Sequence, residues 1–589
     1  MAPQRAGRDI TKQMLRYRQM VLDQMDFKQK AEEKKMSMSK NIARLAVTAG
    51  LTAALSFGGV MAPVTMAFAE GAANGSVAIT NARNNDTEFI GYKIFDANVV
   101  KDENGQTLVS NITWANDKVE TAVKEEINKI DSSASITTAQ DAADWIKTHV
   151  RGTGETTSVE SGSAAYKIAA AVAAVTGLDD TSDYATTSKG AANNLSHGYW
   201  LFVTDASTVT GVEAATAPIF TVVGDEAVEI NEKTSIPTVD KKVKEGDTWG
   251  KVSDSQIGEE IEYKLTGTVA ANIATYDKYQ YVFQDHLSVG LEADLNSVAV
   301  TIGGVSIPLS STAQPENGYT VNLAETMDES KNVTGHDLTI SFTNLKAAAK
   351  AAGATLDEQS EVVVTYKAKL TEKAEYTAAG NTNDVKLVYS NNPMVDGTGT
   401  STSKRVTDHV FRLDVTKVEK DNEGQKLEAT FQVKMTKEGN IELKTKKWLT
   451  QNGGITDKEE EAGKFTTNKG TDKIYIPGLV EGTYEITECN TPAGYNTLAP
   501  FTITVDPTYD NNGNLTNLDV TSSDTVMVTP GNTKDATIPV IIRNKKGSGL
   551  PLTGLNGVTF TWIAGGAVLC IGVAHLIRSR KQAEESEQE

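Results

Sequence analysis

Three polar residues toward the C-terminal end of the chain share strand faces with apolar residues: Lys417, Glu488 and Asn544. Side chains alternate between the two faces of a β-strand, so each of these groups is expected to point into a core. A buried charge without a partner is costly, and such groups pair or become neutral. The apolar residues on the same faces are Leu413 and Val415, Tyr484 and Ile486, and Ile538, Val540 and Ile542.

These three groups could form a covalent bond. Burial lowers the pKa of a lysine and raises that of a carboxylic acid, so Lys417 would be a neutral nucleophile and Glu488 a protonated acid. The acid can polarise the carboxamide of Asn544 and shuttle protons while the amine attacks it. Loss of ammonia leaves an amide bond between side chains. The reaction occurs once, so it is not an enzyme activity. The alternative is a buried ion pair or a solvated lysine.

The same residue types recur earlier in the chain, at Lys241, Asp285 and Asn383. Alternation places Lys241 with Val239 and Val243, Asp285 with Tyr281 and Phe283, and Asn383 with Val385, Leu387 and Tyr389. We predict a Lys241–Asn383 bond assisted by Asp285. Lys242 and Asn381 are the alternatives for the amine and the amide.

The elements that would position these groups are mainly short strands, because apolar and polar residues alternate between turn signals. Many short strands predict β-sandwiches. The fold class is therefore mainly β, with three tandem Ig-like domains. The expected domains are 76–232, 237–405 and 411–544. The expected helices are 120–130, 138–149, 164–175 and 345–352, so the first domain has additional helices. No comparable triad is predicted in that domain.

Composition narrows the class of protein. The chain has 589 residues, a net charge of −20 and a pI near 4.9, which argues against a nucleic-acid partner. Its two cysteines, Cys489 and Cys570, cannot supply a disulfide framework once a C-terminal segment is removed. No zinc spacing or phosphate-binding loop occurs, and Asp510–Asn514 is expected to be a turn, so we predict no metal and no cofactor.

Both ends of the chain carry export signals. Residues 1–69 form an N-terminal extension and signal peptide that ends at Ala67-Phe68-Ala69; Met36 or Met38 is an alternative start. Residues 558–577 are apolar and long enough for a transmembrane helix, and basic residues follow. The sequence directly ahead of this segment is Leu550, Pro551, Leu552, Thr553 and Gly554. An ordinary anchor helix with an accidental pentapeptide is the alternative.

Residues 550–589 resemble the cell-wall sorting signal of Gram-positive surface proteins, in which a sortase cleaves between Thr553 and Gly554 and transfers the threonine to an amine. Tyr484–Tyr495 resembles the E-box of collagen-adhesin B-type domains, with departures at Cys489 and Thr491. In that family the cross-linking lysine and asparagine fall on Lys417 and Asn544. Val282–Leu291 resembles a segment of the isopeptide-forming middle domain of backbone pilins, and Asn383–Pro393 resembles the closing strand of that domain.

Val228–Lys233 resembles the motif that supplies the acceptor lysine of backbone pilins, although Asn231 and Glu232 replace its Tyr-Pro. The resemblance implies the major subunit of a covalently polymerised pilus, joined through Thr553 to Lys233 of the next subunit. Its implied partners are sortase, identical subunits, peptidoglycan, minor tip or base pilins and host ligands. Its implied location is the cell wall and surface. A monomeric wall-anchored adhesin is one alternative, and an exported enzyme is another.

Overall fold

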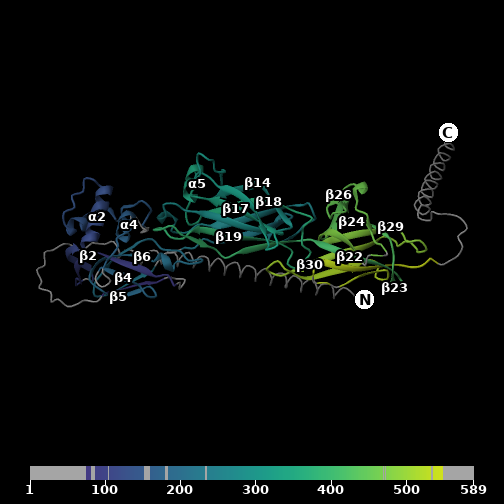
Figure 1. Cartoon of the computed structure of the whole chain (residues 1–589), viewed down its shortest axis with the longest axis horizontal. Coiled ribbons are helices and arrows are strands. Elements are labelled where there is room, and N and C mark those ends of the chain that lie inside the picture. Colours follow the sequence, from purple (N-terminus) through teal and green to yellow (C-terminus); the bar gives the residue numbers. More distant parts are fainter. Residues whose placement is uncertain are drawn as a thin grey trace, which may run out of the picture.

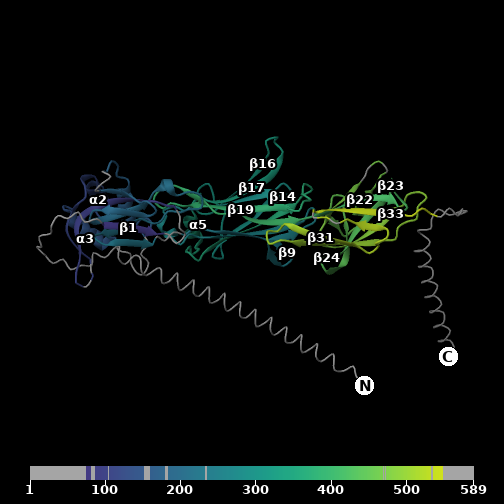
Figure 2. The same ribbon diagram turned by 90° about the horizontal axis from the view of Figure 1, so that it is seen from below.

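The computed structural model describes residues 75–80, 86–103, 105, 107–150, 159–178, 183–231, 235–468, 470, 473–531, 533 and 535–547. The predicted signal peptide, sorting motif, transmembrane segment and Lys233 lie outside these residues. Figures 1 and 2 show that the described part is elongated and mainly β, with three groups of sheets in a row. We call them the first segment (75–231), the middle segment (235–410) and the third segment (411–547). No helix in these described ranges is long and apolar enough to cross a membrane.

The first segment combines two sheets with three helices that lie on one side of it (Figure 1). Asn116 caps the first helix by accepting a hydrogen bond from the Val119 amide, so that helix begins three residues before the predicted start. One sheet has the order β3 (Thr107–Trp114), β2 (Phe89–Lys101), β6 (Gly198–Thr204) and β7 (Ile219–Val223), with β4 (Tyr184–Thr186) on β2. The other has the order β5 (Ala191–Leu195), β1 (Gly75–Thr80) and β8 (Ala227–Asn231). The helices are α2 (Asp117–Ile130), α3 (Ala139–His149) and α4 (Ala164–Ala173).

The middle segment consists of two sheets that enclose one apolar core. A short helix, α5 (Leu345–Ala352), has the predicted bounds. The first sheet has the order β10 (Thr248–Gly250), β9 (Val239–Glu245), β12 (Glu260–Thr268), β18 (Glu361–Leu370), β14 (Leu291–Ile302) and β15 (Val305–Ile307). The second has the order β11 (Val252–Asp254), β21 (Lys404–His409), β19 (Asn381–Ser390), β13 (Tyr281–Ser288), β17 (Val333–Phe342) and β16 (Thr320–Met327), with β20 (Thr398–Thr400) on β19.

The third segment also has two sheets around one core. Its first strand, β22 (Phe411–Glu419), pairs in parallel with β33 (Thr537–Asn544). That sheet continues to β23 (Asn422–Lys426), β28 (Ile474–Leu479) and β32 (Val528–Pro530). The opposite sheet has the order β26 (Ile455–Thr456), β25 (Ile441–Leu449), β24 (Thr430–Glu438), β29 (Gly482–Asn490), β30 (Phe501–Tyr509) and β31 (Leu515–Ser522), with β27 (Phe465–Thr466) on β24.

Candidate functional site: two buried amine–acid–amide clusters

The structure brings Lys417, Glu488 and Asn544 together inside the third segment. Strand alternation points each of them inward, and the side chains of Lys417 and Glu488 are fully buried. Lys417 Nζ contacts Asn544 Oδ1 and lies 3.2 Å from Glu488 Oε1. The amine, the acid and the carboxamide are therefore in mutual contact in a place that excludes water.

Glu488 faces the leaving group of the candidate reaction. Asn544 Nδ2 donates to both carboxylate oxygens of Glu488, at 3.0 and 3.1 Å, and to the backbone carbonyl of Asn496 at 3.0 Å. Leu498 N donates to Glu488 Oε2 at 2.8 Å, which fixes the carboxylate. The turn that follows the E-box thus orients both the acid and the carboxamide.

Burial prepares the third-segment amine for attack. It lowers the pKa of Lys417 to about 8, although the neighbouring Glu488 opposes the shift. The ring of Phe431 lies 5.4 Å from Lys417 Nζ. A larger fraction of this amine is therefore neutral near neutral pH than for a lysine in water.

Lys241, Asp285 and Asn383 form the corresponding cluster in the middle segment. Lys241 Nζ contacts Asp285 Oδ1 and donates to Asn383 Oδ1 at 2.8 Å. The side chains of Lys241 and Asp285 are fully buried, and Asn383 is 1% exposed. Burial lowers the pKa of Lys241 to about 8 and raises the pKa of Asp285, while the attraction between the two opposes both shifts.

The alternatives to this assignment lie elsewhere. Lys242 is exposed on the other face of β9. Asn381 is buried, but its side chain bonds the backbone of Glu375 and the carbonyl of Asp408. Neither residue contacts the cluster among the described interactions, so the geometry favours Lys241 and Asn383.

Tyr366 is a fourth member of the middle cluster that the sequence did not indicate. It lies on β18, and its hydroxyl donates to Asp285 Oδ2 at 2.6 Å and accepts from Asn383 Nδ2 at 2.7 Å. Lys241 Nζ lies 3.3 Å from the same oxygen. Alternation with Val362, Val364 and Ala368 predicts an inward side chain, but not which groups its hydroxyl meets.

One expectation about strand order is wrong. Asn383 was expected on the closing strand of its domain, but β20 and β21 follow β19 in the same sheet. The chain adds β21 to this sheet, where β21 pairs with both β19 and β11, and then continues into β22. In the third segment, by contrast, Asn544 ends β33, the last strand among the described residues.

The described residues of the first segment include a buried amine, that of Lys93. Lys93 on β2 is 1% exposed and contacts Asp96 Oδ1 and Ser196 Oγ, the latter at 2.7 Å. Sequence patterning did not single it out. No carboxamide contacts it in the described part of the segment, so the electrophile that the other two clusters hold is missing there.

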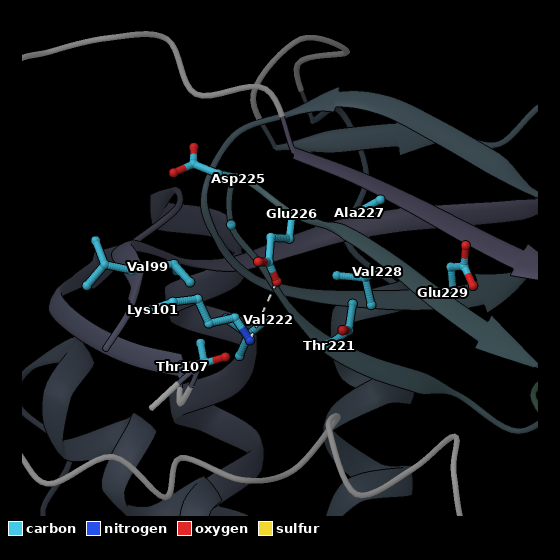
Figure 3. A pocket seen from close by; sticks show the side chains of 13 residues that line it. Val99, Lys101, Thr107, Thr221, Val222, Asp225, Glu226, Ala227, Val228 and Glu229 are labelled. Atoms are coloured by element: carbon cyan, nitrogen blue, oxygen red, sulfur yellow. Dashed lines mark ion pairs between the residues drawn. The ribbon is translucent and has the colours of Figure 1, made fainter. Parts of the chain in front are cut away.

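A pocket of about 590 Å³ also lies in the first segment, beside β8 (Figure 3). Valines such as Val99 and Val228 line it together with acidic residues, and Lys101 Nζ lies 3.7 Å from Glu226 Oε2 at its edge. Both partners are largely exposed. The pocket therefore lacks the buried amine and acid of the two clusters.

The described residues include no group of three or more His, Cys, Asp or Glu side chains arranged to hold a metal ion. Asp510, in the expected turn, instead accepts hydrogen bonds from the backbone amides of Asn512 and Asn514. Cys489 is exposed and points away from the Glu488 face, as alternation predicts.

No family model matches the chain, and no curated protein matches it. Among solved structures, its neighbours are major or backbone pilins of Gram-positive bacteria. The T6 backbone pilin of Streptococcus pyogenes is 16% identical, with 81% of this chain and 99% of that chain covered and a TM-score of 0.46. The major pilin SpaA of Corynebacterium diphtheriae is 16% identical, with 80% and 100% covered and a TM-score of 0.43. The major pilin SpaD of the same organism is 16% identical, with 80% and 98% covered and a TM-score of 0.41. At these identities and TM-scores, the likeness by itself says nothing of this chain's function.

Proposed function

We propose that this chain is the major structural subunit of a covalently polymerised surface pilus, built from collagen-adhesin-type sandwich domains with the boundaries predicted above. Internal amide bonds join Lys241 to Asn383 and Lys417 to Asn544. A sortase joins Thr553 of one subunit to Lys233 of the next. The observation that supports this most directly is the pair of buried clusters, in which an amine, an acid and a carboxamide are in contact.

The chemistry follows from the placement of the groups. A neutral lysine amine attacks the carboxamide carbon, the acid donates a proton to the departing nitrogen, and ammonia leaves. The loops that these bonds would close are long, since the linked residues are 142 and 127 positions apart. In the chain-entropy model, closing a loop of this length removes about 5 kcal/mol of denatured-state entropy.

The load path gives the bonds a mechanical purpose. In a head-to-tail polymer, tension enters a subunit at Lys233 and leaves at Thr553. The two internal bonds carry it past residues 242–382 and 418–543. The first segment lies before Lys233 and thus outside this path, so a cluster without a carboxamide is sufficient there.

Intact mass tests the internal bonds, because each condensation removes one ammonia, about 17 Da. Two bonds predict twice that deficit in the mature chain. Peptide mapping should find Lys241 linked to Asn383 and Lys417 linked to Asn544. An unmodified mass would refute both bonds.

Polymerisation requires a separate test. When the chain is produced with its sortase, a ladder on denaturing gels is expected, and it should disappear in Lys233→Ala. Lys242→Ala is the matched control, since Lys242 is exposed on β9 and should leave the ladder intact. A ladder that persists in Lys233→Ala would exclude this acceptor. A single band in the unmodified chain would favour the monomeric wall-anchored adhesin.

A further inference from the structure

Tyr366 occupies the only link between acid and leaving nitrogen that the described contacts of the middle cluster provide. Asp285 Oδ1 contacts the amine of Lys241, while Asp285 Oδ2 accepts from the Tyr366 hydroxyl at 2.6 Å. Asn383 Nδ2 meets that hydroxyl at 2.7 Å. In the third segment Glu488 contacts the corresponding nitrogen directly. The two clusters therefore connect the acid to the leaving nitrogen by different contacts.

We propose that Tyr366 is a catalytic residue of the Lys241–Asn383 condensation and relays a proton from Asp285 to the departing nitrogen. This inference rests on the proposed function, since it assigns one step of that reaction. The hydroxyl touches the reacting amide group itself.

The direction of the hydrogen bonds explains how the relay operates. In the planar carboxamide the lone pair of Nδ2 is delocalised, so Nδ2 donates to the Tyr366 oxygen. Attack by Lys241 Nζ makes Cγ tetrahedral and localises that lone pair, and the nitrogen becomes basic. The same short contact then carries a proton from the hydroxyl to Nδ2.

The atoms and charges balance. Lys241 Nζ forms a bond to Asn383 Cγ, which leaves a positive charge on Nζ and a negative charge on Oδ1. The Tyr366 hydroxyl turns its proton from Asp285 Oδ2 to Nδ2 and transfers it there, the proton of the Asp285 acid passes to the Tyr366 oxygen, and Asp285 regains a proton from Nζ. The Cγ–Nδ2 bond breaks, the carbonyl reforms and ammonia leaves. Asp285 and Tyr366 end as they began.

Tyr263 provides a matched control for the ring. Its ring lies 5.4 Å from Lys241 Nζ, close to the 5.6 Å of Tyr366, and the two rings stack with centroids 5.3 Å apart. Its hydroxyl is buried and lies near Asn383, but it makes no hydrogen bond to Asp285 or to Asn383 Nδ2 among the described contacts, so it stands outside the relay. Removing that hydroxyl should change the apolar surroundings of the amine but not the relay.

The test is time-resolved cell-free synthesis of the full chain as wild type, Tyr366→Phe and Tyr263→Phe. Cross-linked peptides from both clusters are quantified by mass spectrometry after the synthesis is stopped. We expect Tyr366→Phe to form the Lys241–Asn383 link on the order of 100-fold more slowly, and Tyr263→Phe to form it at the wild-type rate. The Lys417–Asn544 link should form normally in every chain, which reports on synthesis in each sample.

Every other outcome is informative. A wild-type rate in Tyr366→Phe would overturn the relay, and equal slowing in both tyrosine variants would assign the effect to ring packing. If Tyr366→Phe lost its middle-segment melting transition, misfolding would explain the result and the relay would be rejected. Absence of the Lys241–Asn383 link from the wild-type chain would refute the proposed function, and the relay with it.

Discussion

The middle and third segments hold the same three chemical groups but assemble them from different sheets. In the middle segment, Lys241 comes from one sheet while Asp285 and Asn383 come from the other, on the paired strands β13 and β19. In the third segment, Lys417 and Asn544 lie on the adjacent parallel strands β22 and β33, and Glu488 comes from the opposite sheet. The candidate reaction therefore requires only that the groups converge in a dry core, whichever strands supply them.

This difference changes what each bond would restrain. A Lys241–Asn383 bond would tie the two sheets of a sandwich to each other. A Lys417–Asn544 bond would tie two neighbouring strands that are pulled in opposite directions by tension at the termini. The acid shares a sheet with the carboxamide in the middle segment and lies on the opposite sheet from both linked residues in the third segment. Tyr366 connects the shorter Asp285 side chain to the leaving nitrogen.

The largest expected effect comes from removing either acid. Glu488→Ala should leave Lys417 and Asn544 unlinked, raise the mass by one ammonia relative to a fully linked chain with that substitution, and cost about 5 kcal/mol of stability through loop closure. Asp285→Ala should do the same for the middle segment only. Intact mass and calorimetry measure both changes.

Cys489→Ser is the control for the third segment, because Cys489 adjoins Glu488 but is exposed on the other face. It should retain both links and change stability by less than about 0.5 kcal/mol. If Glu488→Ala still formed its link, the third cluster would not need the acid, and the comparison between the two segments would fail.

A smaller effect should distinguish the segments by pH. Burial raises the pKa of Asp408 on β21 to about 7, although the hydroxyls of Ser253 and Ser255 oppose the shift. In the folded chain the Asp408 carboxyl therefore keeps a proton that it releases near pH 4 in the unfolded chain. The contribution of Asp408 to the free energy of unfolding is therefore largest below pH 4, decreases as the pH rises toward 7, and is absent above it. The total change is about 4 kcal/mol.

Calorimetry between pH 4 and pH 8 measures this slope in the middle-segment transition. Asp408→Asn stays neutral at every pH and should flatten the slope, whereas Asp240→Asn, on the exposed face of β9, should leave it unchanged. An unchanged slope in Asp408→Asn would assign the pH dependence to other groups.

The smallest expected effect is a difference in how far the middle and third segments extend under tension when both internal bonds are intact. Because β20 and β21 follow Asn383, the 28 residues from Asp384 to Phe411 stay in the load path, whereas Asn544 ends its strand. Single-molecule pulling between Lys233 and Thr553 should extend the middle segment by at most about 100 Å and the third segment much less. Extension of the third segment by more than the middle one would reverse the comparison.

Alternation predicted much of the candidate site. The inward faces of Lys417, Glu488 and Asn544, and of Lys241, Asp285 and Asn383, agree with the observed burial. The four helical stretches were also found, with ends displaced by a few residues in α2 and α4. These features are local, since strand periodicity and helix caps depend on residues close together in the chain.

The sequence by itself determined which side chains face a core and which chemical groups are available there. Only the tertiary structure decided which sheet supplies each group, that Lys241 rather than Lys242 meets Asn383, and that Tyr366 and the Asn496 carbonyl complete the clusters. A period of two fixes the face of a strand but not its neighbours. Contacts between residues more than a hundred positions apart depend on how the sheets pack, and no local pattern records that packing.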